Sequence, residues 1–189
     1  MSCRYWIPKE GSKDMLNNGK VIYLDGPKKY SLKTSSGKVI AKVSKVSYRK
    51  FQMEGTGLLK SGELVNIGLN DKVFAVVDQK KHPYGIGSDD NSIYPFTSVA
   101  SNDLKLGTKL YVKAIDGLLM PTGQTHNGCL RVDDSGDSFS GCQLDFFVLD
   151  YSYYEKLASK LPETVKVVAQ DCELLNYTDA AVNAWSYQA

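Results

Sequence analysis

The feature that most constrains the fold is a succession of short runs of Val, Ile, Tyr, Thr and Phe, separated by Gly, Asn, Asp and Ser. Such runs are typical of strands, and the residues between them are typical of tight turns. We predict strands at residues 21–24, 29–34, 38 to about 53, 63–67, 73–77, 109–114, 130–133 and 144–149. Helices are predicted at residues 151–161, which Pro162 ends, and in the Ala-rich tail after Thr178. The sequence therefore predicts a mainly β protein with one or two short helices.

The length and charge of the chain exclude several classes of protein. A chain of 189 residues buries a core without needing disulfides, and we expect a single domain. The formal net charge is +2, and the densest basic cluster, Lys80-Lys81-His82, is too short to bind nucleic acid. No apolar run is long enough to span a bilayer, and no secretory leader is recognisable, so any signal peptide has been removed. We expect no nucleic-acid partner, no membrane span and a monomer.

The four cysteines favour disulfides over a metal or redox site, because Cys3, Cys129, Cys142 and Cys172 include no Cys-x-x-Cys spacing. Two bridges, Cys129–Cys142 and Cys3–Cys172, are the simpler prediction; four reduced, buried thiols are the alternative. Residues 176–178 form an Asn-Tyr-Thr glycosylation sequon. Together these features predict a secreted, extracellular protein.

An acidic segment, residues 131–147, holds the candidate catalytic groups. Strand alternation predicts Asp145 on the same face as Phe147, where partial loss of water would raise the pKa of the carboxyl group. Asp134, brought back by a Gly/Ser loop, is the natural second carboxylate, and Asp133 should point the other way. Two carboxyl groups of this kind suit proton transfer to a leaving oxygen. The alternatives are ordinary turn formation and a cation-binding loop.

A long loop, residues 78–98, is a second candidate element of a site. Loops of this length inside compact domains are usually functional, so we interpret it as the wall of a cleft or, equally, as a surface excursion. It contains Tyr84, Tyr94 and, at its end, Phe96, which could stack on sugar rings or fill the core. His82 and His126 have no partners at ligand spacing, and no glycine-rich phosphate loop opens a helix. We therefore predict no metal and no cofactor.

Several motifs together resemble a known family, the double-psi β-barrel "3D" domain and the membrane-bound lytic transglycosylase A group. The signature of this family is Asp-x-Gly, Ile-x-Gly and Asp-x-Phe, which residues 134–136, 139–141 and 145–147 resemble, with Phe139 in place of Ile. Weaker matches cover the Leu-Gly-Thr strand entrance and earlier glycine turns, at residues 54–57, 61–62, 83–84, 86–87 and 106–112. The resemblance spans roughly residues 48–150.

The resemblance implies a six-stranded double-psi β-barrel, to which residues of about 48–98 add an inserted or flanking β subdomain. It implies cleavage of the β-1,4 bond after N-acetylmuramic acid in peptidoglycan, by a lytic transglycosylase or an inverting muramidase. Asp145 matches the general acid of the family, and Asp134 matches the residue that supports the acid or orients substrate. Attack by the sugar's own 6-hydroxyl gives an anhydro product, whereas attack by water gives hydrolysis.

Other candidate substrate-binding residues lie outside the signature. Glu54 precedes the glycines Gly55 and Gly57, Tyr84 is in the long loop, and Thr122 and His126 belong to an extra segment, residues 121–129; Asp133 is the fifth candidate. The extra segment and Cys142 depart from the family pattern and suggest a secreted eukaryotic relative. Two alternatives stay open because a fold does not determine a function. The first is a non-catalytic cell-wall carbohydrate-binding barrel of the expansin or barwin type, and the second is an interaction or inhibitor scaffold.

Overall fold

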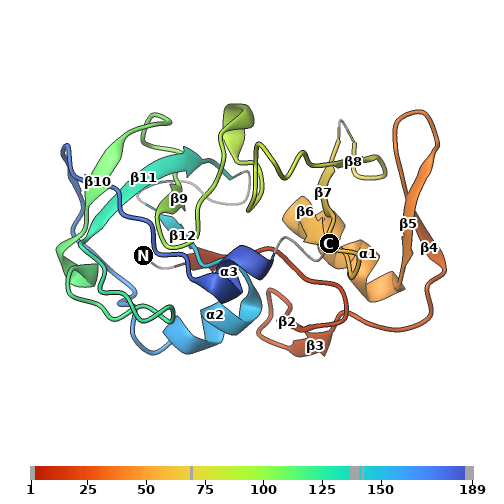
Figure 1. Ribbon diagram of the computed structural model, residues 1–189, viewed down its shortest axis with the longest axis horizontal. Helices are drawn as coiled ribbons and strands as arrows, with labels where there is room; N and C mark the ends of the chain where they lie inside the picture. The colour runs from red at the N-terminus through yellow and green to blue at the C-terminus, as the bar shows by residue number, and fades with distance from the viewer. Residues whose placement is uncertain (1–2, 69, 137–140, 142, 186–189) are drawn as a thin grey trace. The chain divides into compact units, whose positions relative to one another are not determined.

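The computed structural model describes residues 3–68, 70–136, 141 and 143–185 (Figure 1). The chain divides into two compact units. The sheet unit contains the described parts of Met1–Trp6 and Ile86–Asn183, and the N-terminal unit contains those of Ile7–Gly85 and Ala184–Ala189. The β subdomain predicted at about 48–98 therefore overlaps both units.

The sheet unit is built on one six-stranded sheet with the order β1-β12-β9-β11-β10-β13. Its strands are β1 (Cys3–Tyr5), β9 (Ser98–Ala100), β10 (Lys109–Tyr111), β11 (Cys129–Asp134), β12 (Asp145–Phe147) and β13 (Val168–Ala169). The pairs β1–β12 and β9–β11 are parallel, and the other pairs are antiparallel. The prediction of a mainly β protein is confirmed. Among the described residues the sheet has two free edges, at β1 and β13, so closure into a double-psi barrel is not confirmed.

Two helices form where the sequence predicts them. Helix α2 (Tyr151–Leu157) begins after Asp150, whose side chain accepts hydrogen bonds from the backbone N–H groups of Ser152 and Tyr153. Helix α3 (Ala180–Trp185) lies in the Ala-rich tail. Two short 3-10 turns, η1 (Ser88–Asp90) and η2 (Lys113–Ile115), complete the secondary structure of the unit. The core contains mainly β-branched and aromatic side chains of the central strands, namely Val99, Leu110, Leu130, Val132, Phe146 and Phe147.

The disulfide of the sheet unit joins Cys129 to Cys172, with their Cα atoms 5.8 Å apart. The predicted pairings Cys129–Cys142 and Cys3–Cys172 are therefore wrong. Strand β13 pairs with β10, whose other neighbour is β11, and this path returns Cys172 to the start of β11. Sequence spacing does not reveal such a return. Cys142 and the side chain of Cys3 lie outside the described residues.

The N-terminal unit contains two hairpins, one helix and a three-stranded sheet. The hairpins are β2 (Lys13–Met15) with β3 (Val21–Tyr23) and β4 (Tyr30–Lys33) with β5 (Val39–Val43). The helix is α1 (Lys45–Glu54), and the sheet has the order β6 (Thr56–Leu58), β7 (Leu64–Ile67) and β8 (Phe74–Val76). Their buried faces meet in one cluster: Leu24, Leu32, Val43, Phe51, Leu59, Val65 and Phe74.

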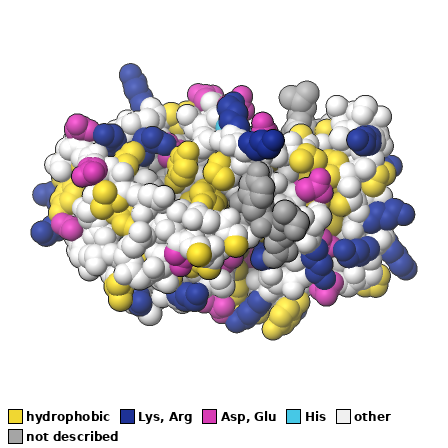
Figure 2. Space-filling view, in the orientation of Figure 1, with side chains coloured by type: hydrophobic (Ala, Val, Ile, Leu, Met, Phe, Trp, Pro, Cys, Tyr) yellow, Lys and Arg dark blue, Asp and Glu magenta, His cyan; other side chains and the backbone are white. Residues whose placement is uncertain are grey.

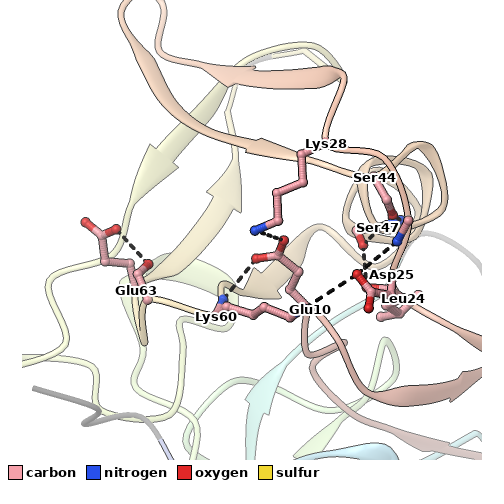
Figure 3. A network of polar contacts seen from close by, with 10 residues as sticks. Glu10, Leu24, Asp25, Lys28, Ser44, Ser47, Lys60 and Glu63 are labelled. Atoms are coloured by element: carbon pink, nitrogen blue, oxygen red, sulfur yellow. Dashed lines mark hydrogen bonds and ion pairs between the residues drawn. The ribbon is translucent and has the colours of Figure 1, made fainter.

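Helix α1 replaces the second half of the strand predicted at residues 38–53. Ser44 caps its start by accepting a hydrogen bond from the Ser47 backbone N–H, and Ser47 donates its hydroxyl to the Leu24 carbonyl (Figure 3). Gly55 ends the helix in the left-handed conformation, with φ 74°. The strand was predicted because β-branched residues recur in this segment of the sequence. The two helix caps decide the local structure instead.

A buried carboxylate ties the N-terminal unit together. Glu10 is 6% exposed; its oxygens accept the Lys60 backbone N–H at 3.0 Å and pair with the Lys28 ammonium at 3.0 Å (Figure 3). Because these contacts join three separate segments of the unit, Glu10 has a structural role. On the face in Figure 2, Lys and Arg side chains are interspersed with Asp and Glu side chains.

Candidate functional site

The sheet register brings the two predicted carboxyl groups to one level. Strand β9 lies between β11 and β12, and Ala100 is the register partner of Asp134 on one side and of Asp145 on the other. Neighbouring strands are about 4.8 Å apart, so the Cα atoms of the two aspartates are separated by roughly 10 Å. The two carboxyl groups therefore belong to one short stretch of the sheet, although ten residues of sequence lie between their strands.

Tyr5 adds a buried hydroxyl to this pair, because β1 pairs with β12 and places Tyr5 opposite Phe147. The centroids of the two rings are 5.1 Å apart. The hydroxyl oxygen is buried and, among the described residues, has no partner with the geometry of a hydrogen bond. Burial raises the pKa of Tyr5 well above its ordinary value, and the charges of Asp134, Asp133 and Asp145 raise it further. The hydroxyl therefore stays protonated within electrostatic reach of three carboxyl groups.

Asp134 is half-buried at the end of β11 and is surrounded by donors. Its Oδ1 accepts the Ser88 hydroxyl at 3.1 Å and the Ser135 backbone N–H at 2.9 Å. Burial raises the pKa of Asp134, and the hydrogen bonds from Ser135 and Ser88 and the interaction with Tyr5 act in the opposite direction. Hydrogen bonds to a carboxylate favour its ionised form, so these neighbours partly offset the effect of burial, which remains the larger.

Asp145 has a different environment at the start of β12. It is half-buried, and its Oδ1 accepts a 2.9 Å hydrogen bond from the neutral side-chain amide of Gln143. Burial raises the pKa of Asp145. Within the described part of the chain, no Lys or Arg side chain pairs with it. A desolvated carboxyl group of this kind retains its proton at a higher pH than an ordinary Asp, which a general acid requires.

Asp133 is held by a bulge and an ion pair. The register of β11 against β9 shifts between Val132 and Asp134, and this shift breaks the simple alternation assumed from the sequence. Asp133 is 2% exposed; its Oδ1 pairs with the Arg131 Nε at 2.6 Å, and its Oδ2 accepts the Ser98 hydroxyl. Because both oxygens have partners inside the protein, Asp133 orders the end of β11. Its predicted contact with substrate stays a prediction.

The segment that carries Ser88 packs closely on β11. A Cβ atom at Gly87 would lie 2.4 Å from the Asp133 carbonyl oxygen and 2.9 Å from the Ile93 Cγ2. Ser88 then reaches Asp134, and its hydroxyl lies 2.6 Å from that of Ser135. The predicted long loop therefore does contribute to the site, through Ser88.

We expect Gly87→Ala to separate Ser88 from Asp134, because the added methyl group overlaps backbone that cannot rotate away. The expected loss of stability is about 1–3 kcal/mol, measured by thermal unfolding. Gly123→Ala is the control for loss of a turn glycine, since its Cβ would meet no atom within 4 Å, although its φ of 85° adds strain. A structure of Gly87→Ala with the 3.1 Å contact between Ser88 and Asp134 intact would contradict this reading.

His126 contacts the protein backbone through both of its ring nitrogens. Its side chain is 1% exposed, its Nδ1 accepts the Gly128 N–H at 2.9 Å, and its Nε2 lies 2.8 Å from the Phe96 carbonyl. Nε2 is therefore the protonated nitrogen, and burial lowers the pKa of the ring. The ring also stacks on Tyr177 with 4.4 Å between centroids. With both nitrogens occupied, a substrate hydrogen bond to His126 would have to displace a backbone group.

None of the described contacts links the other predicted substrate-binding residues to the Asp134–Asp145 cluster. Glu54 and Tyr84 belong to the N-terminal unit, where Glu54 pairs with Lys50 at 2.7 Å and Tyr84 is buried. Thr122 lies in a turn of the sheet unit and donates a 3.4 Å hydrogen bond to the Gln124 side chain. Their roles toward substrate stay predictions.

Two site residues, Tyr5 and Ser88, were missed by the sequence analysis. Tyr5 is distant from the acidic segment in sequence, and only the parallel pairing of β1 with β12 brings it close. Ser88 gave a usable signal because it lies in the loop predicted as a cleft wall, next to the Gly85-Ile86-Gly87 segment. A small polar residue after a glycine in a long loop merits inclusion among candidates.

The fold and the site together define a mainly β protein with a mixed sheet and a half-buried pair of aspartates beside a buried tyrosine hydroxyl. In the described residues, no three His, Cys, Asp or Glu side chains are arranged to hold a metal ion. The described helices are all too short or too polar to cross a membrane.

Comparison with solved structures finds matching chains that include two lytic transglycosylases. No protein-family model and no curated protein matches the sequence. The lytic transglycosylase MltA of Escherichia coli is 11% identical, with 77% of this chain covered and a TM-score of 0.47. The lytic transglycosylase LtgG of Burkholderia pseudomallei is 13% identical, with 84% of this chain and 68% of LtgG covered and a TM-score of 0.45. The chain spans 64% of the length of MltA. At TM-scores below 0.5 these likenesses assign no activity to this chain.

Proposed function

We propose that this protein cleaves the β-1,4 glycosidic bonds of peptidoglycan or a related cell-wall glycan, with Asp145 as the general acid. The observation that carries the proposal is the placement of Asp134 and Asp145 on either side of Ala100, with both carboxyl groups half-buried. Burial raises the pKa of each. Cleavage of a glycosidic bond needs a proton for the departing oxygen and a nearby negative charge for the oxocarbenium-like transition state.

The different environments of the two aspartates support a different role for each. Asp145, with one neutral amide donor, keeps its proton and gives it to the leaving oxygen. Asp134, with donors from Ser88 and Ser135, is ionised; it activates water or orients the 6-hydroxyl of the sugar. A carboxyl separation of about 6.5–9.5 Å leaves room for a nucleophile, whereas a covalent route needs about 5 Å. Two interstrand spacings between the Cα atoms are compatible with the larger separation.

The proposal includes features that were expected from the sequence. Secretion, a eukaryotic-type origin and closure of the six-stranded sheet into a double-psi barrel belong to it, as does a monomeric state. MltA and LtgG, described as lytic transglycosylases, are in keeping with an enzyme of this kind.

Incubation of the purified protein with peptidoglycan sacculi, followed by mass spectrometry of the soluble products, tests the proposed function. We expect release of muropeptides, and a product one water lighter than the hydrolysed form would identify a transglycosylase. Chitin and cellulose oligomers serve as parallel substrates. Sedimentation of the protein with sacculi without any release of fragments would contradict the proposal and favour the carbohydrate-binding alternative.

A further inference from the structure

The Tyr5 hydroxyl is a buried polar group to which the mechanism above gives no role. Its oxygen is inaccessible to solvent and has no partner with hydrogen-bond geometry among the described residues. Leaving a buried hydroxyl unsatisfied is costly, so most such groups bind a neighbour or act in a site. The carboxyl groups nearest to it are those of Asp134 and Asp133 from β11 and Asp145 from β12.

Only one of these three carboxyl groups suits Tyr5 as an acceptor. Asp133 already binds Arg131 and Ser98 through both oxygens. Of the other two carboxyl groups, only Asp134 lies close enough to the Tyr5 hydroxyl to serve as its side-chain hydrogen-bond partner. Tyr5 therefore lies close to Asp134 without yet having the alignment of a regular hydrogen bond, and the packing of its ring on Phe147 limits where the hydroxyl can move.

We infer that Tyr5 is a positioning residue whose buried hydroxyl donates to the ionised Asp134, so that Asp134 is the charged member of the pair and Asp145 is the proton carrier. The inference rests on the proposed function, because it divides the two roles of that reaction. Tyr5 acts through Asp134 and not on the glycan. Three donors, Ser88, Ser135 and Tyr5, would then favour the ionised form of Asp134, against one neutral amide at Asp145.

Tyr5→Phe tests the inference because it removes the hydroxyl and retains the ring that packs on Phe147. Carbon-13 NMR titration of the aspartate carboxyl groups measures the pKa values directly. We expect the pKa of Asp134 to rise by about one unit and that of Asp145 to change much less. The acid limb of the pH profile for glycan cleavage should move to higher pH by the same amount, because cleavage requires the ionised Asp134. An unchanged Asp134 pKa would overturn the inference.

Tyr153→Phe is the matched control. Tyr153 is also a buried tyrosine of the sheet unit; it packs on Phe96 at 5.4 Å between centroids, and burial, with charge from Asp179 and Asp150, raises its pKa to about 12. Loss of the Tyr153 hydroxyl should leave the pKa values of Asp134 and Asp145 and the pH profile of glycan cleavage unchanged. If Tyr153→Phe shifts Asp134 as much as Tyr5→Phe does, the effect is general loosening and the inference is wrong.

The two measurements separate failure of the inference from failure of the proposed function. Cleavage by the wild type together with an unmoved Asp134 titration rejects the role of Tyr5 and leaves the glycosidase intact. Absence of cleavage at every pH rejects the reaction, and with it the positioning role, even where the NMR shift shows that Tyr5 and Asp134 interact.

Discussion

Asp145→Asn is expected to lower the rate of glycan cleavage by about 10²–10⁴-fold, the usual contribution of a general acid. Asparagine has nearly the same shape and keeps an oxygen for the Gln143 amide, which donates to Asp145 at 2.9 Å. It has no proton to give to a leaving oxygen. The expected loss is therefore in turnover, with binding of the glycan retained, and the measurement is the rate of muropeptide release at saturating sacculi.

The direction of the stability change in Asp145→Asn can also be predicted. Burial raises the pKa of Asp145 in the folded protein. Its contribution to the free energy of unfolding is therefore fully present below the unfolded pKa of about 3.9 and is lost as the pH rises through the folded pKa. At a pH above the folded pKa the neutral Asn replaces a buried charge, and there the variant should be at least as stable as the wild type. Asp171→Asn is the control, because Asp171 is exposed and pairs with Lys109 at the surface. Full activity in Asp145→Asn would refute the general-acid role.

The strands and the acidic pair were predictable from the sequence because their signals are local. Alternating β-branched and aromatic residues predicted segments close to β3, β4, β7, β8, β10, β11 and β12. Asp134 and Asp145 were selected because carboxyl groups at strand ends beside aromatic residues are unusual, and the register places both opposite Ala100.

The parts that were not predictable depend on contacts between distant segments or on a balance of weak local terms. Tyr5 reaches the site only through a parallel pairing between β1 and β12, which no spacing in the sequence encodes. Helix α1 depends on caps at Ser44 and Gly55, which outweigh the strand propensity of Val46, Tyr48 and Phe51. His126 was interpreted from its polar neighbours in sequence, whereas its environment is set by Phe96, Gly128 and Tyr177.

The segment from β13 to Tyr177 is held against the sheet by several bonds that differ in strength. The Asn127 amide donates to the Glu173 carbonyl at 2.8 Å, and the Gln124 amide donates to the Asn176 carbonyl at 3.1 Å. Tyr177 donates its hydroxyl to Asn127 at 2.9 Å. Each of these contributes about 1 kcal/mol, and the covalent link from Cys172 to Cys129 is the dominant constraint.

Cys172→Ser is expected to lower the stability by about 4 kcal/mol, from the loop entropy of a bridge that closes 43 residues of sequence. For a chain of this size the unfolding temperature should fall by about 8–16 °C, measured by calorimetry. The hydrogen bonds of the segment remain, so the variant should still fold at low temperature. Reductant should destabilise the wild type equally and have no further effect on Cys172→Ser. Cys142→Ser is the discriminating control. It should have the wild-type stability and the wild-type response to reductant. If Cys129 were instead bridged to Cys142, Cys142→Ser would be the destabilised variant and Cys172→Ser would not.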